Sequence, residues 1–367
     1  NDRFGWSVAN IGDLDGDGVA DIVVGATQDD AGGNNRGAVH IMFMESDGSV
    51  KSTVEINSDT TNGPTLTNTD QFGYSVENLG DLDGDGVNDL AVGASRDNAG
   101  GADRGTIHVM YMNTDGSVKS TVEINDSTEN GPALSAKDQF GTSIAEIDLD
   151  KDGVVDLAVG AVESADPDGK VHIMFMESDG SVKSTVEIND STENGPTLSD
   201  DDEFGASIAN IGDLDGDGVN DLAVGAVEAE DPDGKVHIMF MESSGSVKST
   251  VEINASTENG PTLSADDEFG RSIANIGDLD GDGVKDLAVG ASKDDGGGTN
   301  RGAVHIMFMN ADGSVDSTVE INDSTENGPY GLSNDWFGES VENLGDLDGD
   351  GVNDLAVGAS RDNAGGA

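Results

Sequence analysis

The chain has 367 residues, of which 74 are Asp or Glu and 17 are Lys or Arg, so its formal net charge is -57. This charge argues against nucleic-acid binding, which needs a cationic surface to displace counterions from phosphates, and against adhesion to anionic lipid. There is no cysteine for disulfides or thiolate sites, and no apolar run approaches the roughly 20 residues that span a bilayer, so we expect no direct membrane insertion.

The chain consists of about five and a half copies of one repeated sequence unit. The dipeptide Phe-Gly opens each copy, at successive spacings of 68, 68, 64, 65 and 68 residues. A period of this size indicates a repeat architecture in which each unit buries its faces against its neighbours, and it outweighs the acidic composition as a sign of disorder. The predicted units are residues 4–71, 72–139, 140–203, 204–268, 269–336 and the partial unit 337–367.

Four short strands are expected in each unit. In the first unit, residues 4–12 begin with alternating apolar side chains, and residues 21–26 and 38–44 are continuous apolar runs typical of strands buried on both faces. Residues 50–56 alternate as an edge strand does. Four strands per unit, repeated radially, build a β-propeller blade. The fold class is therefore all-β, and a β-propeller is favoured over a linear β-solenoid, whose coils are usually shorter.

These motifs carry a resemblance to a known family. Phe-Gly opening each unit, Gly-Ala closing the second strand and the Asp-rich loop between them resemble FG-GAP repeats, which form the propeller of integrin alpha chains and of many bacterial and archaeal surface proteins. The resemblance covers residues 1–367 as one propeller domain. The residue after Gly-Ala departs from the family pattern, because it is never proline: Thr27, Ser95, Val162, Val227, Ser292 and Ser360.

The acidic loop is the candidate metal site. Each loop places Asp at positions 1, 3, 5 and 9 and a valine, with its backbone carbonyl, at position 7. Loop by loop, the predicted ligands are Asp13, Asp15, Asp17, Val19 and Asp21; Asp81, Asp83, Asp85, Val87 and Asp89; Asp148, Asp150, Asp152, Val154 and Asp156; Asp213, Asp215, Asp217, Val219 and Asp221; Asp278, Asp280, Asp282, Val284 and Asp286; and Asp346, Asp348, Asp350, Val352 and Asp354.

Hard oxygen ligands in a flexible loop suit Ca²⁺ better than Mg²⁺, which demands a rigid octahedron. We predict about one calcium ion per loop, with a structural role, because six near-identical sites do not single out one for catalysis. The EF-hand template fails, since its twelfth position would be Val24 and strands flank the loop. The third loop should be the weakest site, because Lys151 replaces a glycine. The alternative, solvated acidic turns without metal, leaves four mutually repelling carboxylates in nine residues.

Other repeated residues have simpler interpretations. The five histidines share one position and the ten methionines follow them in pairs, so metal binding is possible but packing between blades is favoured for both, as for the Phe-Gly phenylalanines. Four Asn-x-Ser sequons share another position and could carry glycans if the protein is extracellular. They begin at Asn125, Asn189, Asn254 and Asn322.

No catalytic motif is visible, so we expect a non-enzymatic protein. The resemblance implies an extracellular or cell-surface adhesion module that binds a protein or glycan ligand, and loops of variable length on one rim, such as residues 29–36 and 166–169, are where such a ligand would bind. The unfinished last unit leaves an open sheet edge, which either residues beyond this chain or a neighbouring molecule would complete. The second option is the alternative function, self-association into a filament or surface layer. A third possibility is an accessory domain of a secreted enzyme.

Overall fold

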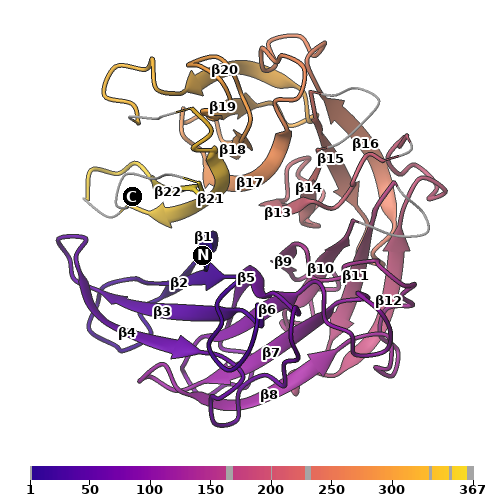
Figure 1. Cartoon of the computed structure of the whole chain (residues 1–367). Helices are drawn as coiled ribbons and strands as arrows, with labels where there is room; N and C mark the ends of the chain where they lie inside the picture. Colours follow the sequence, from indigo (N-terminus) through magenta and orange to yellow (C-terminus); the bar gives the residue numbers. More distant parts are fainter. Residues whose placement is uncertain are drawn as a thin grey trace. The chain divides into compact units, whose positions relative to one another are not determined.

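The computed structural model describes residues 2–162, 168–199, 201–227, 233–329, 333–346 and 349–361. All regular elements in these ranges are β-strands (Figure 1). Among the same residues, no helix has the length and apolar character needed to cross a bilayer. The chain divides into two compact units, one of Asn1–Asp166 with Val171–Glu187 and the other of Pro167–Lys170 with Ile188–Ala367.

The first unit contains three four-stranded sheets, whose strands are paired in sequence order. The first sheet has strands β1 (Phe4–Gly12), β2 (Asp21–Ala26), β3 (Ala38–Met44) and β4 (Val50–Ile56). The second has β5 (Phe72–Gly80), β6 (Asp89–Ala94), β7 (Thr106–Met112) and β8 (Val118–Ile124). The third has β9 (Ile144–Ile147), β10 (Asp156–Ala161), β11 (Lys170–Met176) and β12 (Val182–Ile188).

The second unit contains two four-stranded sheets and one two-stranded sheet, again in sequence order. The fourth sheet has β13 (Ser207–Gly212), β14 (Asp221–Ala226), β15 (Lys235–Met241) and β16 (Val247–Ile253). The fifth has β17 (Phe269–Gly277), β18 (Asp286–Ala291), β19 (Ala303–Met309) and β20 (Val315–Ile321). The partial sixth has β21 (Phe337–Gly345) and β22 (Asp354–Ala359).

The predicted fold class is confirmed: the protein is an all-β propeller of five four-stranded blades and a partial sixth. The burial of each strand follows its composition, since every residue of the apolar strands β6 and β7 is buried whereas the alternating strand β8 is partly exposed. The first strands of the third and fourth blades are shorter than predicted. There, turns replace the start of the strand, as the Ala206 N–H donation to the Glu203 carbonyl shows.

Glycines allow neighbouring blades within a unit to approach closely. A Cβ atom on Gly93, in the Gly-Ala of β6, would lie 2.0 Å from the carbonyl oxygen of Gly141, the Phe-Gly glycine of the next blade. The Ser75 hydroxyl donates to that same carbonyl at 2.8 Å. Ser7 makes the same bond to Gly73 at 2.9 Å. The repeated Phe-Gly, Ser and Gly-Ala motifs therefore form one inter-blade contact.

Apolar clusters between successive blades make up the core. One cluster joins Ile41 and Phe43 of the first blade to Phe72, Met110 and other residues of the second. The Phe-Gly phenylalanines at 72, 140, 204 and 269 have no exposed surface. The prediction that the Phe-Gly phenylalanines pack between blades is confirmed for Phe72, Phe140 and Phe269, which belong to inter-blade clusters, but is wrong for Phe4, which is 52% exposed. The packing role of the methionines is confirmed, because those of the second to fifth blades are buried.

Candidate metal centre

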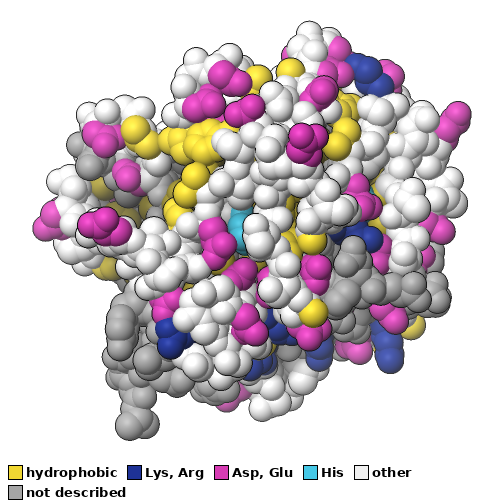
Figure 2. All heavy atoms as spheres, turned by 90° about the horizontal axis from the view of Figure 1, so that it is seen from above, with side chains coloured by type: hydrophobic (Ala, Val, Ile, Leu, Met, Phe, Trp, Pro, Cys, Tyr) yellow, Lys and Arg dark blue, Asp and Glu magenta, His cyan; other side chains and the backbone are white. Residues whose placement is uncertain are grey.

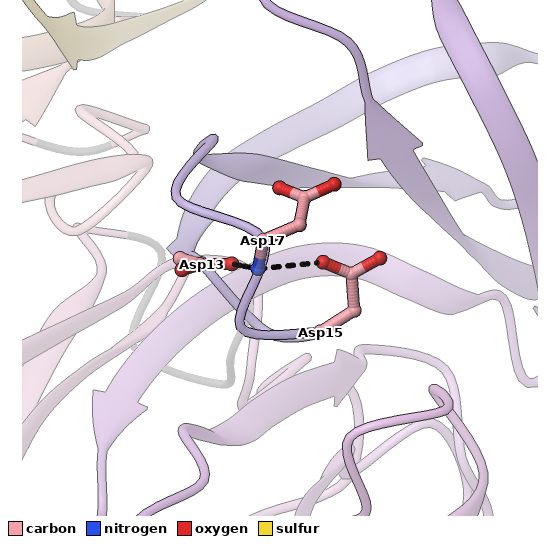
Figure 3. A group of neighbouring side chains, drawn as sticks. All are labelled: Asp13, Asp15 and Asp17. Carbon is pink, nitrogen blue, oxygen red and sulfur yellow. Dashed lines mark hydrogen bonds between the residues drawn. The ribbon is translucent and has the colours of Figure 1, made fainter.

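The first acidic loop folds around its own carboxylates (Figure 3). Asp13 accepts backbone N–H groups of Asp17 and Gly18, each at 2.8 Å, and Asp17 accepts the Val19 N–H at 3.0 Å. Gly16 and Gly18 have φ angles of +77° and +93°, a left-handed conformation that glycine adopts without strain. The tight turn that results holds Asp13, Asp15 and Asp17 together at the surface.

The structure brings three carboxylates within 4.8 Å of one another in each of five loops. In the first, second and fifth loops these are the residues at positions 1, 3 and 5, and in the third and fourth loops they are those at positions 1, 3 and 9. No ion is present. Carboxylate oxygens at this spacing match the hard-oxygen donor set that calcium prefers, so the residues fit the predicted ion.

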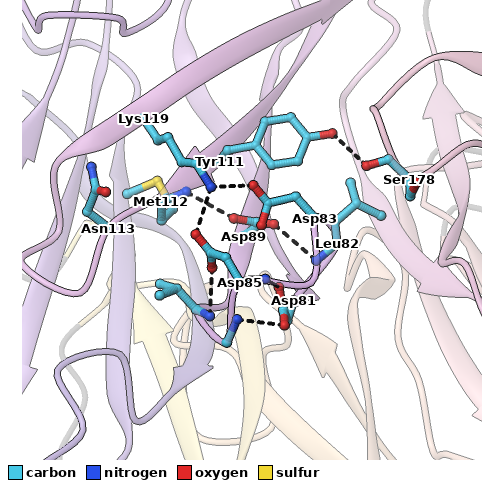
Figure 4. Close-up of polar contacts among 12 residues, drawn as sticks. Asp81, Leu82, Asp83, Asp85, Asp89, Tyr111, Met112, Asn113, Lys119 and Ser178 are labelled. Atoms are coloured by element: carbon cyan, nitrogen blue, oxygen red, sulfur yellow. Dashed lines mark hydrogen bonds and ion pairs between the residues drawn. The ribbon is translucent and has the colours of Figure 1, made fainter.

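The aspartate at position 9 connects the loop to the sheet. Asp21 is buried, and its two oxygens accept the N–H of Leu14 at 3.0 Å and the N–H of Met44 at 2.9 Å. Asp89 makes the equivalent bonds to Leu82 and Met112 (Figure 4). Burial raises the pKa of Asp89, and likewise that of Asp156 and Asp221, to about 6. This aspartate therefore anchors the loop in addition to any role as a ligand.

A lysine from the outer strand lies over each of the first four loops, which the sequence interpretation missed. Lys51 Nζ is 2.8 Å from Asp15 and 2.5 Å from Asp17, and Lys248 Nζ is 2.6 Å from both Asp215 and Asp217. Lys119 and Lys183 make the corresponding ion pairs, the first drawn in Figure 4. Hydrogen bonds to Asp15 and Asp17 raise the pKa of Lys51 above its usual value. The ammonium group supplies the positive charge that a bound cation would bring.

The fifth loop lacks this lysine. The residue at the equivalent position of β20 is Asp316, so that the strand reads Val-Asp-Ser-Thr-Val-Glu-Ile instead of Val-Lys-Ser-Thr-Val-Glu-Ile. Here Asp278, Asp280 and Asp282 form the carboxylate group. A contrast in the sequence could have identified the lysines. The second residue of the fourth strand is a lysine in the first four repeats and an aspartate in the fifth.

Two loops differ from the pattern. In the third, Lys151 has a φ angle of +60°, the region that Gly16, Gly84 and Gly216 occupy in other loops. A side chain is strained there, which agrees with the prediction of a weaker site without testing it. In the sixth, Asp346 accepts the N–H groups of Gly349, Asp350 and Gly351, whereas Asp348 lies outside the described residues.

The remaining predicted features are partly described. The sequon residues Asn125 and Asn322 are 8% and 5% exposed, and their side chains accept the N–H two residues ahead, which closes a turn. Of the short rim turn predicted at 166–169, residues 166 and 167 lie outside the described residues. Figure 2 shows Asp and Glu side chains dispersed over one face, with fewer Lys and Arg side chains among them.

Comparison with known families identifies the repeats. The FG-GAP repeat model matches residues 4–42 and 72–110, and the FG-GAP-like repeat model matches residues 148–224 and 213–289. Among solved structures, a chain described as "Structure of Dos1 propeller" is 12% identical, with a TM-score of 0.40 over 82% of this chain and 59% of that chain. A likeness at this level adds nothing to the assignment.

Several curated relatives are integrin alpha chains. Integrin alpha-4 of Xenopus laevis is 30% identical over 257 residues, which cover 70% of this chain and 22% of the relative. Integrin alpha pat-2 of Caenorhabditis elegans is 29% identical over 245 residues, covering 61% and 18%. Integrin alpha-6 of Gallus gallus is 36% identical over 164 residues, covering 44% and 14%. The chain thus spans about a fifth of the length of these relatives.

Proposed function

This chain belongs to the FG-GAP repeat family of integrin-alpha-like propellers, and on that premise we propose that it is a calcium-binding extracellular adhesion or ligand-binding module. The observation that carries the proposal is the carboxylate group repeated in five acidic loops. Its calcium ions would brace the scaffold, and the rim loops would contact a protein or glycan. The repetition of near-identical carboxylate groups favours a binding protein over an enzyme, because it does not single out one loop for catalysis.

The ligands of each calcium ion would come from a single loop. The carboxylates at positions 1, 3 and 5 lie on one turn and the buried aspartate at position 9 starts the next strand, so that an ion held by them would join the loop to the sheet. In the first four loops the ion would displace the lysine ammonium from the carboxylates at positions 3 and 5. Calcium binding and lysine pairing are therefore mutually exclusive.

The experiment for the binding function uses the full chain immobilised on beads and probed with arrays of extracellular-matrix proteins and of glycans. We expect retention of a subset of these probes in calcium and its loss in chelator. Equal capture of every probe with and without calcium, or no capture at all, would contradict an adhesion function. Calcium titration of the same preparation separates loss of ligand binding from loss of calcium binding.

A second candidate function is that of a protomer in an extracellular filament or layer. The observation in its favour is β22, which is half-buried along its length whereas the equivalent strands β6, β14 and β18 are buried throughout. In the described part of the chain no further strand pairs with β22. Such an edge can accept a strand either from further residues of the same protein or from another chain, and this candidate requires the second. Electron microscopy of calcium-loaded protein should show ordered filaments or sheets if this candidate holds, and separate particles if it does not.

A further inference from the structure

A second cluster of ionisable side chains occurs in three repeats, away from the acidic loops. It combines an aspartate two residues before Phe-Gly, an aspartate three residues after Gly-Ala, and a His and a Glu that lie opposite each other on the third and fourth strands. We call it the His–Asp cluster. In the first repeat its histidine and aspartate, His40 and Asp29, are each 17% exposed, whereas in the second and fifth repeats they are buried. Its buried copies are Asp97, His108 and Glu123 of the second repeat with Asp70 from the end of the first, and Asp294, His305 and Glu320 of the fifth repeat with Asp267 from the end of the fourth.

The spacing between histidine and aspartate is the same in both clusters. His108 Nε2 lies 3.9 Å from Asp97 Oδ2, and His305 Nε2 lies 3.9 Å from Asp294 Oδ2. This exceeds a hydrogen bond of about 3 Å. Neither ring nitrogen of these histidines has a hydrogen-bond partner among the described residues, although the side chains are only 0% and 1% exposed. One metal ion with bonds of about 2.1 Å to nitrogen and to oxygen would span this gap.

The aspartates of the two clusters are buried, whereas Glu123 is exposed and Glu320 is half-buried. Asp70, Asp97, Asp267 and Asp294 are each no more than 5% exposed, and the Asp267 and Asp294 carboxyl groups interact directly. Burial, followed by repulsion from Asp70 and Glu123, raises the pKa of Asp97 to about 7. Burial, followed by repulsion from Asp294, raises the pKa of Asp267 to about 7 as well. A cation between these groups would relieve both effects.

The histidines are in the form that binds metals. Burial lowers the pKa of His108 to about 3 and that of His305 to about 4. Both rings are therefore neutral at physiological pH, and a neutral imidazole has a nitrogen lone pair free for coordination.

The fourth repeat shows what replaces the cluster where the aspartate after Gly-Ala is missing. There, Lys235 Nζ lies 3.2 Å from Asp202 Oδ2, and both side chains are buried. Lys235 stands two residues before the strand histidine, the position of Thr106 in the second repeat and of Ala303 in the fifth. In the fourth repeat, Lys235 therefore places a positive charge beside the aspartate that precedes Phe-Gly. The second and fifth repeats have no lysine at this position, and they place a second aspartate, the one after Gly-Ala, beside the first.

We propose that the His–Asp clusters of the second and fifth repeats are sites for a divalent metal that accepts imidazole nitrogen, the class to which Zn²⁺ belongs. The aspartate after Gly-Ala and the histidine supply two ligands, and the other two carboxylates balance the charge of the ion. Calcium prefers oxygen ligands alone, so a mixed nitrogen and oxygen set selects a different ion from that of the acidic loops.

The experiment measures zinc retained by the full chain after dialysis in excess calcium, which occupies the acidic loops. The test variant is His305→Gln, and its matched control is His237→Gln, which alters a histidine equally buried in the fourth repeat, where Lys235 already stands. We expect His305→Gln to lower the zinc content by one ion per chain and His237→Gln to leave it unchanged. Ala303→Lys, which copies the fourth repeat, should also remove one zinc ion and serves if His305→Gln fails to fold.

Two results would overturn the proposal. One is a wild-type chain that retains no zinc in excess calcium. The other is an equal zinc content in His305→Gln, Ala303→Lys and His237→Gln. Neither result depends on calcium binding by the loops, which is measured on the same samples, so failure here is distinguishable from failure of the proposed function.

Discussion

At the scale of single residues, the lysines over the acidic loops should oppose calcium binding. Lys248 pairs with Asp215 and Asp217, whereas the fifth loop has Asp316 at the equivalent position. A calcium ion in the fourth loop must first displace an ammonium group, and an ion in the fifth meets an additional carboxylate on the neighbouring strand. The fifth loop should therefore bind calcium more tightly than the first four.

Substitutions at the position of Lys248 and Asp316 test the effect of the lysine on calcium binding. Asp316→Lys should weaken calcium binding at the fifth loop, and Lys248→Ala should strengthen it at the fourth, each by up to roughly fivefold, because exposed ion pairs are weak. Calcium titration calorimetry measures both. Asp312→Lys, the same charge change in the turn before β20, is the control. An effect of Asp312→Lys as large as that of Asp316→Lys would show that net charge, and not displacement, sets the affinity.

Lys151 is a second residue-scale test, since its φ of +60° places a side chain where other loops have glycine. Lys151→Gly should stabilise the chain by about 1 kcal/mol, because the left-handed conformation is strained for residues with a Cβ. Chemical denaturation measures the change. The substitution should also raise the calcium affinity of the third loop. Unchanged stability together with unchanged affinity would mean that the third loop is not strained.

Asp97 gives the chain a pH dependence of stability. Its pKa is raised from 3.8 to about 7, so its contribution to stability is present below the unfolded value and is lost as pH rises through about 7. Asp97→Asn removes this loss. In metal-free buffer, the unfolding free energy of the variant relative to that of the wild type should rise between pH 4 and 8. The rise should reach roughly 1–4 kcal/mol at pH 8, since one pKa unit is about 1.4 kcal/mol. A difference in unfolding free energy that is constant with pH would contradict the raised pKa.

At the scale of the strand and the blade, the inter-blade contact depends on glycine. Gly93→Ala places a Cβ 2.0 Å from the Gly141 carbonyl, which must separate the second and third blades. We expect destabilisation of about 3 kcal/mol or more. Ser75→Ala removes only the hydroxyl donor to the same carbonyl and should cost about 1 kcal/mol. Thermal unfolding ranks the two variants. If Gly93→Ala were as stable as Ser75→Ala, the close approach would not be needed.

Most of the strand boundaries could be predicted from the sequence. The strands of the first blade begin and end where the apolar patterns of residues 4–12, 21–26, 38–44 and 50–56 predicted, because repetition turns weak local signals into one consensus. The shorter β9 and β13 were not predicted, since the same Phe-Gly motif starts those blades and only local turn hydrogen bonds delay the strand.

The candidate sites were predicted less completely than the strands. The acidic residues of each loop are adjacent in sequence, so their grouping could be predicted. The pairing of Lys51 with Asp15 joins residues from different strands of a blade, and the approach of His108 to Asp97 depends on how a loop folds back over the sheet. Spacing along the chain does not show such distances. The backbone bonds that bury Asp21 are likewise visible only in the folded loop.

At the scale of the whole molecule, the net charge opposes folding. The formal charge of -57 favours expansion of the chain, and six calcium ions would bring it only to -45. Calcium would contribute more through binding than through net charge. At ten to a hundred times its Kd, each ion would add roughly 1.4 to 2.7 kcal/mol to the free energy of unfolding. Several such sites together can decide whether the chain folds.

The central claim is that calcium holds this propeller together, and thermal unfolding tests it most directly. The full chain is heated in excess calcium and, in a parallel sample, in excess chelator at the same ionic strength, so that screening of the net charge is equal. The account predicts a clearly higher Tm in calcium, rising further with calcium concentration. Equal Tm values in calcium and in chelator would contradict it.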